Sequence, residues 1–100
     1  MDVIASFGDN ATEDLYHGAR SRRARGFPAD IAPAALRKLD MLNAAHRLLD
    51  LRSPPGNRLE ALRGKWRGFH SIRVNEQWRV VFRWAEGQAH DVRVVDYHRG

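Results

Sequence analysis

The chain has no cysteine, which excludes disulfide bonds, thiolate nucleophiles and cysteine metal ligands. It also has no apolar run near the roughly 20 residues that span a bilayer. Residues 1–7 lack the basic start and long apolar stretch of a signal peptide. We therefore expect a cytoplasmic protein with no membrane partner.

Motifs for metal and cofactor chemistry are missing as well. The five histidines include no His-x-x-x-His pair. No glycine-rich phosphate loop follows an expected strand, and no Gly-x-Ser-x-Gly elbow occurs. The sequence thus predicts neither a metal site nor a cofactor.

Lysine is scarce although the chain is basic. Of the 17 basic residues only Lys38 and Lys65 are lysines, and the net charge is +5. Guanidinium groups bind phosphate through paired hydrogen bonds and stack on bases, so an arginine-rich domain favours nucleic acid or an acidic protein as partner. A high-GC genome explains the same composition equally well.

A chain of 100 residues is long enough for a modest core, and we expect one domain over residues 1–100. Weak alternation predicts a strand over residues 2–7. Asn10 and Glu13 have capping-box spacing, which predicts a helix that continues through the arginine cluster at 20–25. That cluster either contacts RNA or is a solvated helix end.

A second helix is predicted with Pro33 in its first turn, a position that suits proline. Its apolar stripe has spacings of three and four, and residues 53–56, with two prolines and a glycine, end it. The stripe consists of Leu36, Leu39, Leu42, His46 and Leu49.

The second half of the chain reads as an antiparallel meander. Strands are expected over residues 69–74, 78–84 and 89–95, and residues 59–64 form either a strand or an irregular segment. The predicted fold is therefore α+β, with two N-terminal helices packed on one face of a small antiparallel sheet.

Alternation along these strands predicts which face is open. Apolar side chains at 72, 74, 78, 80, 82 and 84 belong under the helices. The opposite face receives Arg73, Arg79, Arg93 and, less centrally, Arg83. Arginines on an exposed strand face are commonly solvated, but several converging on one face favour a cationic binding site.

The chain closes with Asp96, Tyr97 and His98. A histidine transfers protons near neutral pH, and a tyrosine stacks on bases. Strict alternation places Tyr97 on the Arg93 side and the other two on the opposite side. His98 reaches the arginine face only if the strand twists, bulges or ends near Val95; otherwise it is a terminal residue without a role.

Three segments together carry a resemblance to a known family: residues 57–64, residues 68–82 and residues 94–98. They resemble the HigB-type toxins of bacterial toxin–antitoxin modules, in the RelE/ParE superfamily, also called plasmid maintenance system killer proteins. The resemblance covers nearly the whole chain. The pair Trp78-Arg79 with the closing Asp96-Tyr97-His98 is its most specific part.

The resemblance implies a small ribonuclease that cuts messenger RNA in the ribosomal A site without a metal. It also implies a HigA-like helix-turn-helix antitoxin that neutralises the toxin. The toxin–antitoxin complex would then bind operator DNA and repress its own operon.

The resemblance also implies roles for individual residues. Arg79 would stabilise the transition state, His98 would transfer protons, Tyr97 would stack on a base and Asp96 would position the site. Arg63 would bind phosphate, with Lys65 as a possible substitute. Phosphate binding on the open face would involve Arg73 and Arg93.

Glu60 departs from the family pattern, because relatives can carry a histidine there. A carboxylate in that place acts as a base if its pKa is raised, so the general base is either Glu60 or His98. Glu60 reads equally well as a surface ion pair with Arg58 or Arg63.

Two other functions remain open. A ParE-like poison would bind DNA gyrase on the same fold without cleaving RNA. A non-catalytic module would bind nucleic acid or protein through its basic face, with salt-sensitive affinity. A gyrase poison has no chemical use for Arg79 together with residues 96–98.

Overall fold

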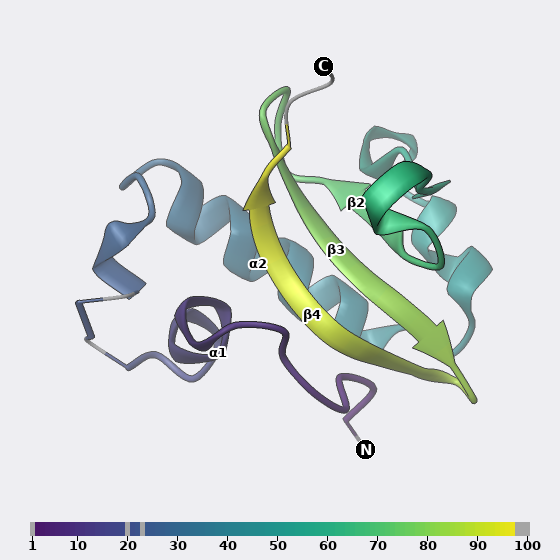
Figure 1. Cartoon of the computed structure of the whole chain (residues 1–100), viewed down its shortest axis with the longest axis horizontal. Coiled ribbons are helices and arrows are strands. Elements are labelled where there is room, and N and C mark those ends of the chain that lie inside the picture. The colour runs from purple at the N-terminus through teal and green to yellow at the C-terminus, as the bar shows by residue number, and fades with distance from the viewer. Residues whose placement is uncertain (1, 20, 23, 98–100) are drawn as a thin grey trace.

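The computed structural model describes residues 2–19, 21–22 and 24–97. Within this part of the chain, two α-helices accompany a four-stranded antiparallel sheet of order β1-β2-β3-β4 (Figure 1). The strands are β1 (Glu60–Ala61), β2 (His70–Arg73), β3 (Trp78–Ala85) and β4 (Gln88–Asp96). The predicted α+β class is confirmed. None of the helices described is long and apolar enough to cross a membrane.

Both predicted hairpins are present. Before β3, the side-chain oxygen of Asn75 accepts hydrogen bonds from the backbone N–H groups of Gln77 at 2.8 Å and Trp78 at 2.7 Å. Between β3 and β4, Glu86 and Gly87 both have positive φ, 54° and 76°. This is the two-residue turn whose twist matches the strands that it joins.

Helix α2 (Ile31–Ala44) lies behind β3 and β4 in Figure 1. Its buried residues Ile31, Ala35, Leu39 and Leu42 form one stripe against the sheet. The helix was predicted correctly, with Leu39 and Leu42 in its buried stripe.

The predicted end of this helix was wrong. It stops at Ala44, so His46 lies outside it, and Leu49 is 63% exposed. The cause is local: the carboxylate of Asp50 accepts hydrogen bonds from the backbone N–H groups of His46 and Arg47, both at 3.0 Å. These bonds favour a new 3-10 turn, η2 (Leu48–Arg52), over further α-helix.

Helix α1 (Asn10–Tyr16) lies beside β4 and packs on α2. Its N-cap is Asp9, which accepts a bond from Thr12 N at 2.8 Å, rather than Asn10 as predicted. The helix also does not continue to residue 25, which corrects the prediction. Gly18, at φ 72°, ends it in the left-handed conformation that glycine adopts readily.

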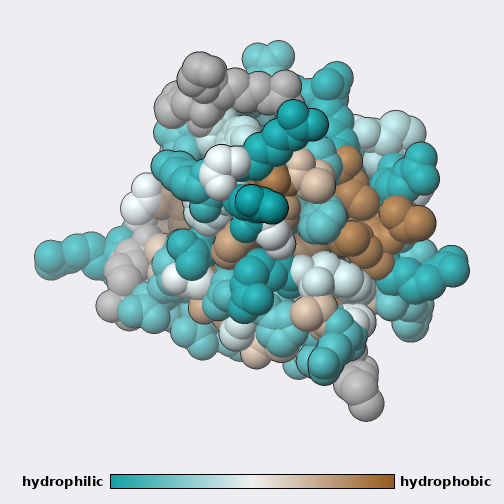
Figure 2. Space-filling view, turned by 45° about the vertical axis from the view of Figure 1, so that its right-hand side comes forward, coloured by the Kyte–Doolittle hydropathy of each residue, from teal (hydrophilic) through white to brown (hydrophobic). Residues whose placement is uncertain are grey.

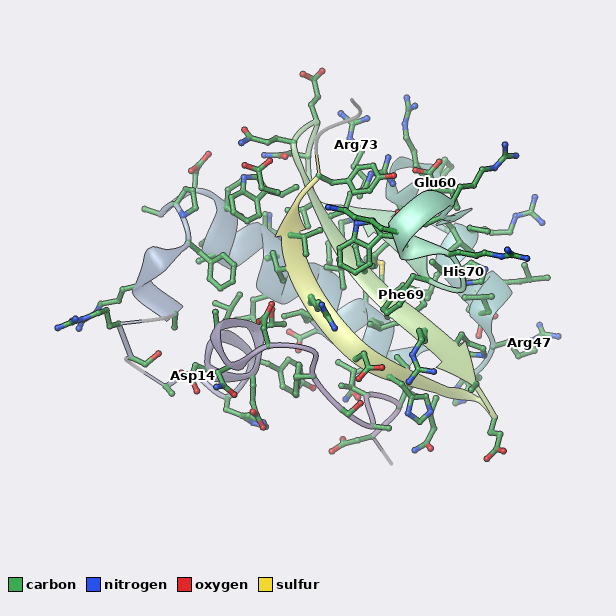
Figure 3. The ribbon with its side chains drawn as sticks, in the orientation of Figure 1. Asp14, Arg47, Glu60, Phe69, His70 and Arg73 are labelled. Carbon is green, nitrogen blue, oxygen red and sulfur yellow. The ribbon has the colours of Figure 1, made fainter. Side chains whose placement is uncertain are left out.

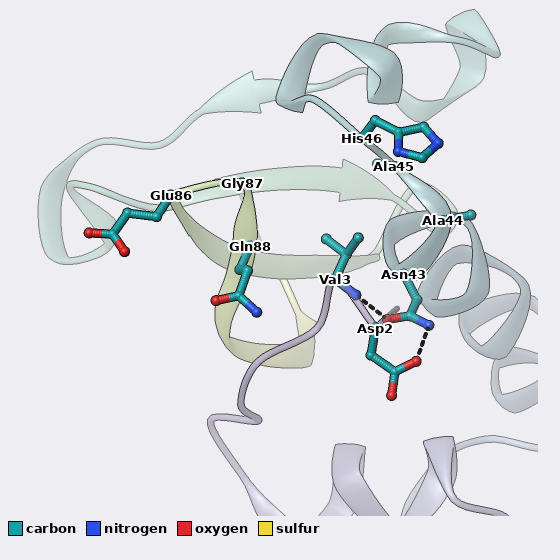
Figure 4. A pocket seen from close by; sticks show the side chains of 9 residues that line it. All are labelled: Asp2, Val3, Asn43, Ala44, Ala45, His46, Glu86, Gly87 and Gln88. Carbon is teal, nitrogen blue, oxygen red and sulfur yellow. Dashed lines mark hydrogen bonds between the residues drawn. The ribbon is translucent and has the colours of Figure 1, made fainter.

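Residues 2–7 do not form the predicted strand. They make two isolated parallel bridges to β4, Ile4 with Ala89 and Phe7 with Val92. The side-chain oxygen of Asn43 in α2 accepts the N–H group of Val3 at 2.9 Å (Figure 4) and that of Ile4 at 3.0 Å. The segment is therefore bonded both to α2 and, at its two bridges, to β4.

Residues 59–64 were left open between strand and irregular segment, with strand favoured. Only Glu60 and Ala61 pair, and the chain then passes through the 3-10 helix η4 (Gly64–Trp66). This loop lies in front of the sheet in Figure 1, on the side opposite α2. Leu62 and Val81 are buried on that side.

The strand parity predicted for the core is confirmed by Ile72, Val80 and Phe82, which are fully buried in the helix-side cluster. Alternation fails once, in β4, where the register shifts between the pairs Val81–Arg93 and Arg83–His90. The extra residue is a β-bulge at Asp91, which has φ 52°.

Candidate functional site

Arg79 is the central residue of the sheet face that was predicted to be open, and the η4 loop covers part of that face. Arg79 is only 7% exposed, yet it belongs to the face opposite the helices. Its Nη1 donates to the hydroxyl oxygen of Ser71 at 2.8 Å and lies 3.0 Å from Oε1 of Glu60. The register explains this contact, because Glu60 pairs with Ser71 and Arg73 pairs with Arg79.

Tyr97 lies against the same guanidinium group, on the arginine face of the sheet where alternation predicted it. The Arg79 Cζ is 5.5 Å from the centroid of the tyrosine ring, a cation–π distance. The backbone N–H of Tyr97 donates to the Gln77 carbonyl at 2.7 Å, which continues the pairing past β4.

Asp96 pairs with Trp78, and its Oδ2 accepts a bond from the Gln77 side chain at 3.0 Å. Asp96 therefore fixes the end of the β2–β3 hairpin beside the site. His98 lies outside the described residues.

A polar hollow of about 280 Å³ opens next to this group. Its lining contains three arginines, Arg58, Arg73 and Arg79, with Asn75 and Glu76. The ion pair between Arg73 and Glu76 is long, 3.9 Å, and the Glu76 side chain is 94% exposed. Figure 3 shows Arg73 and Glu60 at the same end of the sheet. The hollow is therefore suited to an anion.

The remaining predicted cations are placed differently. Arg63 and Lys65 are exposed in the loop around η4. Arg93 lies over two rings, with its Cζ 5.5 Å from the Trp66 centroid and 6.0 Å from that of Phe69. Arg83, beyond the bulge, is paired with Asp91 at 2.6 Å.

The structure brings Glu60, Arg73, Arg79 and Tyr97 together, and it adds Ser71, which we did not predict as a site residue. Ser71 is fully buried. A polar residue on the arginine side of β2 was the signal for it. Trp66 was also missed, although basic residues alternate with it in the sequence.

The site offers a proton acceptor beside a fixed cation. The Glu60 side chain is 37% exposed, so water or a substrate can reach its carboxylate. Arg79 is held by a carboxylate and a hydroxyl, so it needs little reorganisation to meet developing negative charge. Among the described residues, no three histidine or acidic side chains gather in a way that would hold a metal ion.

A second hollow, of about 500 Å³, lies between the N-terminal segment, the end of α2 and the β3–β4 turn (Figure 4). Its charged lining includes the acidic side chains of Asp2 and Glu86. It therefore suits an anionic ligand less well than the arginine hollow.

The architecture defines a class of protein. Two solved structures of the YoeB–YefM toxin–antitoxin complex from Staphylococcus aureus share it, with TM-scores of 0.52 and 0.53. Each match covers 95% of this chain and 97% of the other, at 16% identity, so the likeness shows the fold alone. That fold is the RelE-like toxin fold.

Sequence comparison gives the family. The family profile described as "RelE-like toxin of type II toxin-antitoxin system HigB" matches residues 3–98. Toxin HigB-1 of Vibrio cholerae serotype O1 is 46% identical over 87 residues, which is 87% of this chain and 90% of that protein. An uncharacterized protein of Haemophilus influenzae is 38% identical over 65% of this chain and 64% of its own length. The chain belongs to the HigB family of RelE-like toxins of type II toxin–antitoxin systems.

Proposed function

We propose that this toxin is an endoribonuclease that cuts messenger RNA on the ribosome without a metal. The observation that carries the proposal is the contact between Arg79 and Glu60 at 3.0 Å, next to the arginine-lined hollow. This contact places the accessible carboxylate of Glu60 beside the fixed guanidinium group of Arg79. RNA cleavage by its own 2′-hydroxyl requires such a base and such a cation.

The reaction would proceed by in-line attack. A base, Glu60 or His98, takes the proton of the 2′-hydroxyl while the 2′-oxygen bonds to phosphorus. The bond from phosphorus to the 5′-oxygen breaks, and an acid protonates that leaving oxygen. The products are a 2′,3′-cyclic phosphate and a 5′-hydroxyl. Arg79 would stabilise the charge on the phosphate oxygens in the transition state.

Neighbouring groups would hold the RNA. Arg73 and Arg58 line the hollow beside Arg79 and would bind flanking phosphates. Exposed Arg63 and Lys65 would extend this basic path.

One aromatic residue, Tyr97, and one acidic residue, Asp96, complete the proposed site. Tyr97, already stacked on Arg79, would orient a base. Asp96 would position the end of the site through its bond to the Gln77 side chain.

The proposed partners follow from the family. A helix-turn-helix antitoxin of the HigA type would neutralise the toxin, and the complex would bind operator DNA. Both structural neighbours are YoeB–YefM complexes, one of them described as a toxin–antitoxin heterotetramer, which supports an antitoxin partner. Because ribosomes are the proposed site of action, the toxin would work in the cytoplasm.

The test is cleavage of mRNA on programmed ribosomes, with new 5′ ends mapped and EDTA present. Arg79→Ala should lower the single-turnover rate by about 100-fold or more. Glu60→Gln and His98→Ala identify the base, since loss of the true base removes the acidic limb of the pH–rate profile. Arg83→Ala, on the same strand but paired with Asp91, is the matched control and should retain activity.

Full cleavage by Arg79→Ala would refute the site. No cleavage by the wild type, combined with inhibition of DNA supercoiling, would instead indicate a ParE-like gyrase poison.

A further inference from the structure

Arg93 has an environment unlike that of a phosphate-binding arginine. Its guanidinium lies over the rings of Trp66 and Phe69, 5.5 and 6.0 Å from their centroids. Its Nε is buried and has no hydrogen-bond partner among the described residues. Arg93 is therefore held by stacking rather than by hydrogen bonds, and its flat group becomes part of an aromatic surface.

The two rings form the rest of that surface. Trp66 and Phe69 meet edge to face, with centroids 5.2 Å apart and planes at 76°. Both residues are partly exposed. Figure 3 shows Phe69 in front of the sheet, on the side of the η4 loop.

Basic residues surround this aromatic surface. Arg63, Lys65 and Arg67 are exposed and alternate with glycines and aromatic residues in the same loop. Figure 2 shows the side of the molecule that carries the β1–β2 edge, where hydrophilic side chains cover most of the surface between separate hydrophobic areas. Aromatic side chains among basic ones are the usual means of binding single-stranded nucleic acid.

The surface lies on the same face as the candidate catalytic residues. Arg93 pairs with Val81. Two residues further along the strands, Val95 pairs with Arg79, and side chains two residues apart lie on the same face of the sheet. Two residues along a strand span about 7 Å. An RNA strand with one phosphate at Arg79 can therefore reach the aromatic surface with a neighbouring nucleotide.

We propose that Trp66, Phe69 and Arg93 form a stacking platform for one nucleobase of the RNA, next to the nucleotide that is cut. The proposal rests on the proposed function, which gives the face its RNA. Stacking is tolerant of base identity, since every base has a flat π face. The platform would therefore add affinity and position the strand, while Arg79 acts on the phosphate.

Binding of uncleavable RNA tests the platform independently of catalysis. The probe is a short single-stranded RNA with 2′-O-methyl groups throughout, which cannot supply the attacking hydroxyl. Its affinity is measured by fluorescence anisotropy at low salt. Trp66→Ala should weaken binding roughly 5- to 100-fold, and Trp66→Phe, which keeps a ring, should lose much less.

Abasic probes show whether a base occupies the platform. Removing the base from one nucleotide at a time should weaken wild-type binding strongly at one position. With Trp66→Ala, the same abasic probe should bind no more weakly than the intact one, because the partner of that base is already gone.

Gly8 offers a variant that leaves the rings intact. A Cβ at Gly8 would overlap Nε of Arg93, and it would lie 2.7 Å from Cγ of Arg93 and 2.8 Å from the backbone oxygen of Asp91, whereas at Gly26 it meets nothing within 4 Å. Gly8→Ala should therefore displace Arg93, together with the backbone at Asp91, and weaken RNA binding several-fold. Gly26→Ala is the matched control, and thermal melting of both variants verifies that they fold.

The inference is overturned if Trp66→Ala binds the intact probe as tightly as the wild type, or if wild-type toxin does not bind the probe at low salt. It is also overturned if Trp66→Ala loses antitoxin binding while RNA binding is unchanged, which would make the surface an antitoxin contact. Normal RNA binding with no cleavage on ribosomes would refute the proposed function and leave the platform standing.

Discussion

At the scale of single residues, the most informative feature is the buried guanidinium group of Arg79. Arg79 is 7% exposed and is held by the Glu60 carboxylate and the Ser71 hydroxyl. Removing one partner of such a group leaves the other uncompensated, which costs more than the contact itself contributes. Variants at Glu60 therefore require a stability measurement beside each activity measurement.

His70 should make stability depend on pH. Burial lowers the pKa of His70 below its ordinary value, and its Nδ1 has no partner among the described residues. As the pH falls through about 6.5, the unfolded chain binds a proton more readily than the folded one. The free energy of unfolding should therefore decrease between pH 7.5 and 5.5.

Urea denaturation at these two pH values measures the effect. His70→Phe keeps an aromatic ring beside Phe82 and should show a smaller decrease than the wild type. The control is His46→Phe, at an exposed position, which should keep the wild-type decrease. An unchanged decrease in His70→Phe would contradict the assignment.

Part of the candidate site was predictable at this scale. Period-two alternation correctly placed Arg73, Arg79 and Tyr97 on one face. The contact between Glu60 and Arg79 was not predictable, because the two-residue strand β1 has no periodicity from which to derive its register. The stacking of Arg93 was missed because it depends on the path of the η4 loop.

At the scale of elements, a buried hydroxyl of α1 is hydrogen-bonded to the sheet. Thr12 is fully buried, and its Oγ1 accepts the backbone N–H of Val94 at 2.9 Å. Thr12 thereby supplies an acceptor for a backbone N–H group on the edge of β4, beyond the bridges that residues 2–7 make with this strand. A helix side chain thus replaces a neighbouring strand at this point.

Thr12→Val should therefore destabilise the protein by about 1–3 kcal/mol, because it leaves a buried N–H without an acceptor. Thr12→Ser keeps the acceptor and should cost only about 0.8 kcal/mol for the lost methyl group. Urea denaturation compares the two variants, and hydrogen exchange at Val94 locates the change. Equal losses in both variants would show that packing, not the hydrogen bond, is responsible.

The kinds of elements were predictable, whereas their lengths were not. The two hairpins follow from short polar links between alternating strands, and α2 follows from its apolar stripe. The early ends of both helices depend on local hydrogen bonds, at Asp50 and around Gly18, which compete with helix continuation. The spacing of apolar residues therefore does not predict where these helices end.

At the scale of the whole molecule, the net charge of +5 is less informative than its placement. Arg58 and Arg73 line the hollow beside Arg79, while Arg47 and Arg52 are exposed around η2. In Figure 3, Arg47 is labelled away from Glu60 and Arg73. The two pairs of arginines carry equal charge but should contribute differently to RNA binding.

We expect the double variant Arg58→Ala with Arg73→Ala to reduce the slope of log K against log salt by about 1.4, or 0.7 for each lost phosphate contact. Arg47→Ala with Arg52→Ala removes the same net charge and should leave the slope nearly unchanged. RNA affinity at several salt concentrations gives both slopes. Equal reductions would mean that overall charge, not the hollow, attracts the RNA.

The bulge at Asp91 determines where this chain can change in length. With one residue fewer there, the pairs Val81–Arg93 and Arg83–His90 would still face each other across a regular ladder. With one residue fewer between Val92 and Tyr97, every later side chain would point to the opposite face, and Tyr97 would leave Arg79. Insertions and deletions among relatives should therefore gather at the bulge and avoid the six residues that follow it.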